Sequence, residues 1–371
     1  MTRVLVLNCG SSSVKYRLFD GSSTVAKGLL ERLGEAGGDA PDHRAALQQI
    51  MESVDLGGLV AVGHRVVHGG SAFTGPTIVD DAVAADIEAL IPLAPLHNPA
   101  ALAGIAVARK LLPEVPQVAV FDTAFHATIP PEGVTWAIDA SLAARWQIRR
   151  YGFHGTSHAY VARRTAALLG KPVAETDVIT LHLGNGASAC AVRGGRSVAT
   201  SMGMSPQGGL VMGTRSGDID PTVIFHLHRV AGLPIDEIER SLTRFAGLQG
   251  LTGENDLRAV LARRAAGDAA ATLAFDVYCR RIREYVGAYL AVLGRADAIT
   301  FTAGVGENSP DVRAASLSGL ESLGIAVDPA RNDRAEQIIS PDGTPIAVCV
   351  IPTDEELEIA DQSRAALELA V

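Results

Sequence analysis

The chain has 371 residues, 47% of them hydrophobic and 20% charged, and a formal net charge of −9 at pH 7. This composition is typical of a folded globular protein, and the length exceeds that of one ordinary hydrophobic core, so we expect two domains. The acidic balance, without a dense block of Lys and Arg, argues against nucleic acid as a main partner. A small anionic substrate needs only a few local cations and stays possible.

The N-terminal sequence MTRVLVLNCG lacks the charged leader, long apolar run and small-residue cleavage site of a signal peptide. No uninterrupted apolar run reaches the ~18 residues that a membrane-spanning helix needs. We therefore expect a cytoplasmic protein without a membrane partner. Its four cysteines, Cys9, Cys190, Cys279 and Cys349, form no CxxC pair, which predicts buried reduced thiols rather than a disulfide framework or a thiolate zinc site.

The first predicted element is a β-hairpin. Residues 4–7 (VLVL) form a short apolar run typical of a buried strand, and residues 14–19 alternate as a second strand does. The intervening sequence NCGSSSVK has the glycine, serines and lysine of a phosphate site, but it lacks the GxxxxGK[ST] pattern and the following helix of a P-loop. We therefore expect a strand–turn–strand cradle, in which backbone N–H groups and the hydroxyls of Ser11 and Ser13 face an anion.

A similar sequence begins the second half of the chain. Residues 178–181 (VITL) precede HLGNGAS, and an offset of 174 residues (182 − 8) places His182 over Asn8 and Gly184 over Gly10. Two such hairpins, each at the head of one half, indicate a duplicated domain with a phosphate-binding hairpin in each copy. Chance similarity between two Gly- and Ser-rich turns is the alternative.

The other predicted elements make the chain a mixed α/β protein. Apolar spacing and the Gly and Pro residues that end each segment predict strands over 115–121 and 298–302 and helices over 100–112, 158–169, 269–293 and 357–369. Residues 34–41 are rich in Gly and Ala and are expected to form a loop.

Two motifs place polar side chains near strand ends, and a third forms a turn that enters the next helix. Arg65, in GHRVVHGG, has the donor geometry to hold a carboxylate or phosphate bidentately, although a surface arginine is the alternative. Asp122 follows the strand over 115–121, at the carboxyl end where open α/β sheets carry their sites. It faces a metal or a transferring group, or it caps the next helix. His97, in LAPLHNP, either lines a site or caps a helix.

Four further motifs are dense in functional groups. His154 lies in a tight turn beside cations in RRYGFHGTSH, and Arg215 lies among glycines and carboxylates in MGTRSGDIDP. In FTAGVGENS, a Gly-rich turn with Gly304 and Gly306 follows a strand and suits the ribose and phosphate of a nucleotide. PTDEE, at residues 352–356, supplies either a metal carboxylate or the acidic first turn of a helix.

The pairs His64/His68 and His154/His158 have the spacing of zinc ligands on a helix. The first pair lies in a Val-rich predicted strand, and neither pair has the glutamate of HExxH. A zinc hydrolase is therefore not expected.

Together these motifs closely resemble the acetate kinases of the acetokinase family. The motifs occur in the family's order between Val4 and about Ala360: NCGSSSVK, GHRVVHGG, LAPLHNP, VFDTAFH, YGFHGTSH, HLGNGAS, TSMGMSP, MGTRSGDIDP, FTAGVGEN and PTDEE. The resemblance implies the actin/hexokinase/Hsp70-like superfamily, an α/β fold of duplicated ribonuclease H-like domains whose mixed sheets are flanked by helices, with an interdomain cleft. It implies an N-terminal actin-like domain of residues 1–126 plus 357–371, on the acyl-substrate and metal side. A C-terminal actin-like domain of residues 127–356 would lie on the nucleotide side.

The resemblance also implies the activity: reversible, direct in-line phosphoryl transfer from ATP to acetate, giving ADP and acetyl phosphate, with Mg²⁺ or Mn²⁺. It implies a homodimer and a place in acetyl-CoA biosynthesis. Catalytic roles fall to Arg65, Asp122, His154 and Arg215. The resemblance assigns metal binding to Asn8 and Glu355. Substrate binding falls to Arg65, Val67, Leu96, His97 and Pro206. Nucleotide binding is assigned to Ser11, Ser13, Lys15, His182, Leu183, Gly184, Asn185, Gly186, Asp256, Leu257, Arg258, Gly304, Val305, Gly306, Glu307 and Asn308.

Elementary chemistry agrees with most of these roles. Transfer between two anions needs mainly positioning and charge neutralisation. A carboxylate is already ionised near neutral pH and needs no general base, so we interpret Asp122 as a residue that orients an arginine or the water shell of the metal.

Some features depart from the family pattern. Residues 28–47 form a shorter segment than is usual, Gly208 and Ala199 replace acidic residues, and the nucleotide loop reads TGENDLR. These departures leave loop shape, nucleotide preference and oligomer contacts open. Propionate kinase is one alternative, because one methylene in an apolar pocket changes binding by only about 1–3 kcal/mol. A non-catalytic nucleotide-binding module is another, although it has no need of Arg65, Asp122, His154 and Arg215 together.

Overall fold

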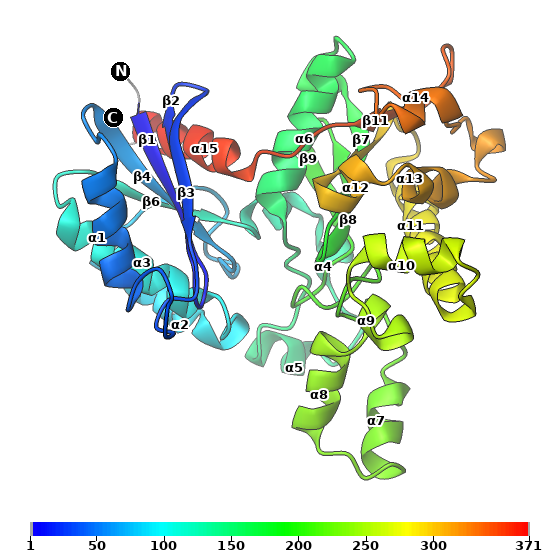
Figure 1. The fold of residues 1–371 in the computed structure, drawn as a ribbon, viewed down its shortest axis with the longest axis horizontal. Helices are drawn as coiled ribbons and strands as arrows, with labels where there is room; N and C mark the ends of the chain where they lie inside the picture. Colours follow the sequence, from blue (N-terminus) through cyan, green and yellow to red (C-terminus); the bar gives the residue numbers. More distant parts are fainter. Residues whose placement is uncertain (1–2, 370–371) are drawn as a thin grey trace. The chain divides into compact units, whose positions relative to one another are not determined.

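The computed structural model describes residues 3–369 (Figure 1). The contacts between residues divide this chain into two compact units. Among the described residues, the first unit contains 3–127, 155–157 and 354–369, and the second contains 128–154 and 158–353. Each unit is built on one β-sheet.

The first unit contains a six-stranded sheet in the order β3-β2-β1-β4-β6-β5. Its strands are β1 (Arg3–Cys9), β2 (Val14–Asp20), β3 (Ser23–Leu30), β4 (Leu59–Val66), β5 (Thr77–Ile78) and β6 (Gln117–Phe121). The first three strands form an antiparallel meander, and β1, β4 and β6 run parallel. The predicted first hairpin is therefore confirmed.

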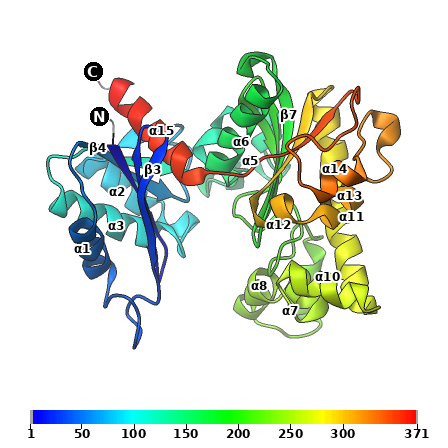
Figure 2. The same cartoon turned by 45° about the horizontal axis from the view of Figure 1, so that its top comes forward.

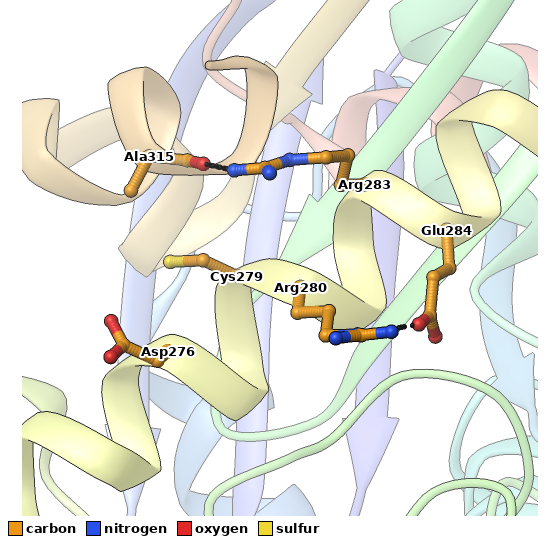
Figure 3. Close-up of a pocket in the computed structure, with 6 residues that line it drawn as sticks. All are labelled: Asp276, Cys279, Arg280, Arg283, Glu284 and Ala315. Atoms are coloured by element: carbon orange, nitrogen blue, oxygen red, sulfur yellow. Dashed lines mark hydrogen bonds and ion pairs between the residues drawn. The ribbon is translucent and has the colours of Figure 1, made fainter. Parts of the chain in front are cut away.

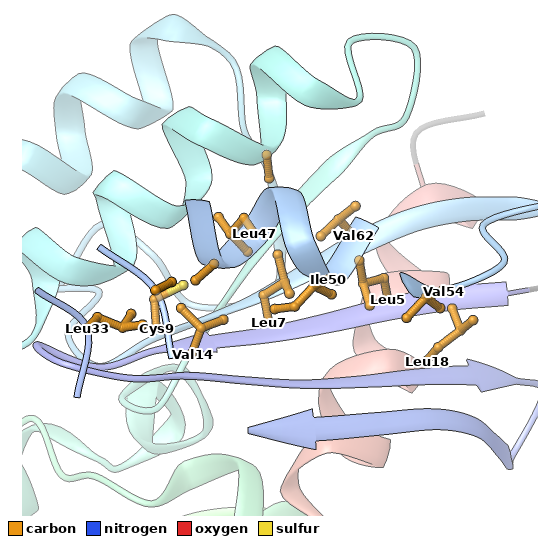
Figure 4. Packing of buried hydrophobic residues seen from close by; sticks show 13 residues of the cluster. Leu5, Leu7, Cys9, Val14, Leu18, Leu33, Leu47, Ile50, Val54 and Val62 are labelled. Carbon is orange, nitrogen blue, oxygen red and sulfur yellow. The ribbon is translucent and has the colours of Figure 1, made fainter. Parts of the chain in front are cut away.

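The two faces of this sheet are covered by different helices, because successive side chains of a strand point to opposite faces. Leu5 and Leu7 of β1 belong to a buried cluster with Leu47 of α1 (His43–Ser53) and Ala108 of α3 (Asn98–Leu111), part of which is drawn in Figure 4. On the other face, Val4 and Val6 pack with residues of α15 (Glu355–Leu369). Figure 2 shows this C-terminal helix beside the N-terminal strands. Helix α2 (Asp81–Ala89) packs on α3.

The second unit contains a five-stranded sheet in the order β11-β10-β7-β8-β9. Its strands are β7 (Asp177–Leu183), β8 (Ala187–Arg193), β9 (Arg196–Thr200), β10 (Ala298–Thr302) and β11 (Ala347–Val350). Strands β7, β8 and β9 form an antiparallel meander, while β7, β10 and β11 run parallel. Helix α11 (Ala269–Leu293) packs on β7 and β8, and α6 (Gly155–Leu168) begins in the first unit and continues into the second.

The two sheets share one topology. Each begins with three antiparallel strands and then adds parallel strands beside the first one, so β3-β2-β1-β4-β6 matches β9-β8-β7-β10-β11. The first strands begin at Arg3 and Asp177, which reproduces the offset of 174 residues (177 − 3) found in the sequence. The predicted duplication is confirmed, with a mixed sheet flanked by helices in each copy.

The remaining helices are mostly short and lie in the second unit. They are α4 (Pro131–Val134), α5 (Ala140–Arg145), α7 (Thr222–Arg229), α8 (Ile235–Arg244), α9 (Gly247–Thr252), α10 (Leu257–Ala265), α12 (Ala303–Asn308), α13 (Pro310–Leu317) and α14 (Pro329–Asp333). None of the described helices has the length and apolar composition needed to cross a membrane. The four cysteines are free and buried, as the sequence predicted.

Predicted element boundaries are largely confirmed, and one assignment is wrong. The helix over 269–293 and the strand over 298–302 agree at both ends. The Gly-rich segment over 304–308, predicted to be a turn, is helix α12. Sequence periodicity misses so short a helix, which here depends on a contact between its own ends: the carboxylate of Glu307 accepts a hydrogen bond from the backbone N–H of Ala303 (2.8 Å).

Candidate active site

The predicted site residues fall into two groups, one in each unit, and each group is described separately. The first unit carries Asn8, Ser11, Ser13, Lys15, Arg65, Val67, Leu96, His97, Asp122 and Glu355. The second carries His154, the hairpin residues 182–186, Pro206, Arg215, residues 256–258 and residues 304–308.

Arg65 and Asp122 form an ion pair at the carboxyl ends of two neighbouring parallel strands, β4 and β6. The Nε of Arg65 donates to Oδ1 and Oδ2 of Asp122 at 3.0 and 3.2 Å, and Nη2 donates to Oδ2 at 2.7 Å. Asp122 is 1% exposed, whereas the side chain of Arg65 is 24% exposed. Among the described residues, the third guanidinium nitrogen, Nη1, has no hydrogen-bond partner. Arg65 is thus oriented by Asp122 and keeps donors for an anion.

Electrostatics tie Glu355 and His97 to this pair. Burial raises the pKa of Asp122, the positive charge of Arg65 opposes that rise, and the negative charge of Glu355 adds to it. A positive charge on His97, like that of Arg65, lowers the pKa of Asp122. The neighbouring carboxylates, Asp122 foremost, raise the pKa of Arg65, so the guanidinium stays charged throughout the physiological pH range. Glu355 and His97 therefore lie close enough to Asp122 to act on its charge.

The PTDEE segment forms the acidic first turn of α15, one of the two alternatives that the sequence left open. Asp354 caps the first turn of α15 by accepting from the N–H of Leu357 at 3.0 Å, and it also pairs with Arg17. Glu356 pairs with Lys15 of β2. The Oε2 of Glu355 accepts from the hydroxyl of Thr156 at 3.4 Å. Lys15, expected to contact nucleotide phosphate, is thus engaged by a carboxylate, although its side chain remains 53% exposed.

His97 stands at the N-cap position of α3, but its side chain makes no capping hydrogen bond. Beside it, the fully buried amide of Asn98 accepts from the N–H of His68 at 3.2 Å and donates to the carbonyl of His68 at 3.0 Å. This bidentate contact fixes the start of α3 to the end of the β4 segment, a role that nothing in the sequence indicated. Leu96 is 65% exposed, and Val67 is half-buried.

The two predicted phosphate hairpins close in a similar way. The N–H of Gly10 donates to the carbonyl of Ser13 at 2.8 Å, and the N–H of Gly184 donates to the carbonyl of Gly186 at 3.1 Å. Each turn therefore joins two antiparallel strands of its own unit, as the sequence predicted.

In the second unit, hydroxyl groups link two histidines. The Nδ1 of His154 lies 2.9 Å from the Oγ of Ser188, and the same Oγ lies 2.8 Å from Nε2 of His158. The Nδ1 of His158 lies 2.7 Å from the Oγ1 of Thr180, and the ring of His182 stacks on that of His154 at 4.2 Å. These contacts orient the His154 ring. Sequence reasoning missed Ser188 and Thr180, because only the pairing of β7 with β8 brings them to α6.

Arg215 and His154 approach the same side of the second hairpin. A Cβ atom added to Gly186 would lie 3.3 Å from Nη2 of Arg215 and 3.6 Å from the ring of His154. The Nη1 of Arg215 donates to the carbonyl of Pro206 at 2.6 Å, and partial burial lowers the pKa of the Arg215 guanidinium. The structure therefore brings three sequence-predicted groups of the second unit together.

The two segments predicted for the adenosine are helix starts. Asp256 caps α10 by accepting from the N–H of Arg258 at 2.9 Å and also pairs with its guanidinium, which is 91% exposed. Leu257 is 6% exposed and packs in the interior. The segment over 304–308 follows β10 directly as α12.

A cavity of about 480 Å³ lies away from all of these residues, between α11 and α13 (Figure 3). Its two arginines are already engaged: Arg280 with Glu284 at 2.9 Å, and Arg283 with the carbonyl of Ala315 at 2.5 Å. It has none of the sequence-predicted groups in its lining.

A model of the acetokinase family matches residues 3–361. The chain belongs to this family. As a member, it is a phosphotransferase with a carboxyl group as acceptor. It is 55% identical to a protein named acetate kinase from Streptomyces avermitilis, in an alignment that covers 98% of this chain and 97% of the relative. It is 56% identical to an acetate kinase from Clavibacter michiganensis subsp. michiganensis, covering 99% of both chains.

Solved structures of related enzymes have the same fold. The crystal structure of Porphyromonas gingivalis acetate kinase matches with a TM-score of 0.94 and 40% identity, covering 99% of this chain and 100% of the other. That of a propionate kinase from Francisella tularensis subsp. tularensis matches with a TM-score of 0.93 and 39% identity, covering 98% and 100%. Fold similarity of this degree does not separate the two acyl substrates.

Proposed function

We propose that the protein is an acetate kinase that transfers the terminal phosphoryl group of ATP to acetate, giving acetyl phosphate and ADP reversibly and without a covalent enzyme intermediate. The observation that carries this proposal is the Arg65–Asp122 pair at the carboxyl ends of β4 and β6. A buried carboxylate holds the guanidinium in place, and Nη1 remains to bind the carboxylate of an acyl substrate or the phosphoryl group in transfer.

The chemistry needs no general base. A simple carboxylic acid has a pKa of about 4, so acetate is ionised and nucleophilic at neutral pH. Asp122 accepts three hydrogen bonds from Arg65 and is enclosed by the protein, which fits an orienting role better than proton removal. The acetate methyl is assigned to Val67, Leu96 and Pro206 in this proposal, with His97 beside the carboxylate.

Arg215 and His154 supply the positive charge and hydrogen-bond donors for the transferring phosphoryl group. Such groups act most strongly when they are held in place before the reaction, because no reorganisation is then needed. The Ser188 contact and the stacked His182 ring hold His154, and the Pro206 carbonyl holds Arg215. The nucleotide phosphates are assigned to Lys15 and to both hairpins, and the adenosine to residues 256–258 and 304–308.

A Mg²⁺ ion is assigned to residues of the first unit in this proposal. Glu355 and Asp122 lie close enough for the charge of one to raise the pKa of the other, and Asn8 adds an amide oxygen. Mg²⁺ prefers oxygen ligands and usually takes one or two carboxylates together with substrate phosphates and water. In the proposal Asn8 and Glu355 hold this ion, directly or through water. The ion would neutralise charge on the phosphates.

A homodimer and a cytoplasmic location complete the proposal. Helices α7 and α8 and the residues that follow them expose large apolar side chains: Val223, Phe225, Val230, Ile235 and Phe245. An apolar surface of this kind is typical of an interface between subunits. The four free cysteines fit a reducing compartment. Light scattering of the purified protein tests the dimer, and Phe225→Glu is expected to shift the mass toward the monomer.

The activity is tested by trapping acyl phosphate as the hydroxamate, with MgATP and acetate, propionate or butyrate. We expect acetate to give the highest kcat/KM. Arg215→Ala should lower kcat by about 10²–10³-fold with little change in protein stability, because it removes an electrostatic contact made in the transition state. Arg280→Ala, which changes an exposed arginine on α11 of the same unit, is the matched control.

The outcomes separate the alternatives. A higher kcat/KM with propionate would retain the family and the Arg215 role while showing that the apolar pocket is assigned incorrectly. No acyl phosphate with any of the three acids, together with ATP binding, would favour a non-catalytic nucleotide-binding module and refute the catalytic assignments.

A further inference from the structure

The carboxylate of Glu307 accepts hydrogen bonds from other parts of the protein, which a residue that only binds nucleotide does not need. Its Oε1 accepts from the backbone N–H of Ala303 at 2.8 Å, from the backbone N–H of Thr353 at 3.1 Å and from the hydroxyl of Thr302 at 3.4 Å. One carboxylate oxygen therefore joins the first residue of α12 to the segment that follows β11, far away in the sequence. That oxygen is occupied by the protein itself.

Thr353 is the last residue of the second unit, and Asp354 opens the final segment of the first. On the far side of this peptide bond, Asp354 accepts from Arg17 at 2.8 and 3.0 Å and caps α15. Each side of the crossing is thus anchored within its own unit. Glu355, which acts on the charge of Asp122, comes directly after it.

Helix α12 is anchored at both of its ends. At its C-terminal end, the fully buried guanidinium of Arg313 donates to the carbonyls of Gly306 (3.0 Å) and Glu307 (2.9 Å). At its N-terminal end, Ala303 has a φ of 65°, a left-handed conformation that costs a residue with a Cβ atom free energy. Backbone strain of this sort persists only where the surroundings impose it. The Glu307 carboxylate, which accepts the Ala303 N–H, is one of the contacts that impose it.

We propose that Glu307 is a positioning residue that couples occupancy of the nucleotide site at α12 to the affinity of the acyl-substrate site in the first unit. The inference rests on the proposed function, which places the adenosine beside α12 and the carboxylate of the substrate at Arg65. A nucleotide that shifts α12 shifts the Thr353 N–H through Glu307. The displacement is passed along the backbone to Asp354 and Glu355. By linkage, the acyl substrate must change the affinity for the nucleotide by the same factor.

The test measures the dissociation constant of MgADP by titration calorimetry, with and without saturating acetate. ADP and acetate do not react with each other, so binding is read without turnover. In the wild-type protein we expect acetate to change the Kd of MgADP by a factor on the order of 10. Glu307→Ala removes the acceptor and should bring that factor to within about twofold of one. Glu307→Gln keeps an Oε1 acceptor and should restore it.

Asp328→Ala is the matched control, because Asp328 also caps a helix of the second unit by accepting from a backbone N–H (3.0 Å) but has no contact with Thr353. It should lower stability and leave the coupling factor unchanged. A wild-type factor of one, an unchanged factor in Glu307→Ala, or equal loss in Asp328→Ala would each overturn the inference. If acyl phosphate still forms in those cases, only the inference fails. If the wild-type protein neither binds MgADP nor forms acyl phosphate, the proposed function fails with it.

Discussion

His64 makes the stability of the first unit depend on pH. It is 2% exposed on β4, beside Arg65, and its Nε2 lies 2.8 Å from Oε1 of Gln117. The amide nitrogen of Gln117 donates to the carbonyl of Val115 at 2.8 Å, so Oε1 is the acceptor and Nε2 of His64 carries the proton. Burial lowers the pKa of the ring to about 4 from an ordinary 6.5, so the ring is neutral at pH 7.

The direction and the size of the pH effect on the unfolding free energy follow from proton linkage. Between pH 6.5 and about 4, the unfolded chain binds a proton at His64 that the native protein does not bind. The stability associated with the neutral ring is thus complete above pH 6.5 and is lost as the pH falls through about 4. The shift of about 2.5 units (6.5 − 4) corresponds to about 3 kcal/mol of unfolding free energy.

The perturbation is His64→Gln, which cannot titrate but keeps an N–H donor for Gln117. Urea unfolding at pH 7 and at pH 4.5 gives the pH-dependent loss of stability for each protein. We expect the wild-type protein to lose about 2–3 kcal/mol more than the variant. His226→Gln, at an exposed position of α7, should follow the wild-type protein. Equal losses in the wild-type protein and His64→Gln would refute the assignment of a neutral buried ring.

Two further substitutions test the site. Arg313→Met should lower the unfolding free energy by at least about 3 kcal/mol, because it removes four hydrogen bonds from a buried charge to α12 and Asn332. Urea unfolding measures this loss. Wild-type stability in the variant would contradict the prediction. Asp122→Asn should lower kcat/KM for acetate by about 10²–10³-fold, because Arg65 loses its charged partner. Its pH–rate profile should keep the wild-type shape, and loss of one limb of that profile would show instead that Asp122 is a proton acceptor.

Much of the site was predictable because its residues belong to short contiguous motifs. Arg65 and Asp122 each follow an apolar strand segment, and parallel neighbouring strands place their carboxyl ends side by side. The hairpin at Gly10 was readable from residue types alone. The roles of Ser188, Thr180 and Asn98 were not, because each contacts a residue at least 22 positions away, and residue type alone does not tell which partner it meets.

The amino-acid sequence by itself determined the strand and helix segments, the duplication at an offset of 174 residues (177 − 3) and the family. These depend on periodicity and on local residue order, which a linear chain displays directly. Only the tertiary structure decided that residues 303–308 form a helix, that Lys15 is held by Glu356, and that Glu307 reaches Thr353. Each of these depends on which distant segments the folded sheets bring within hydrogen-bonding distance, and no local pattern of residues encodes that distance.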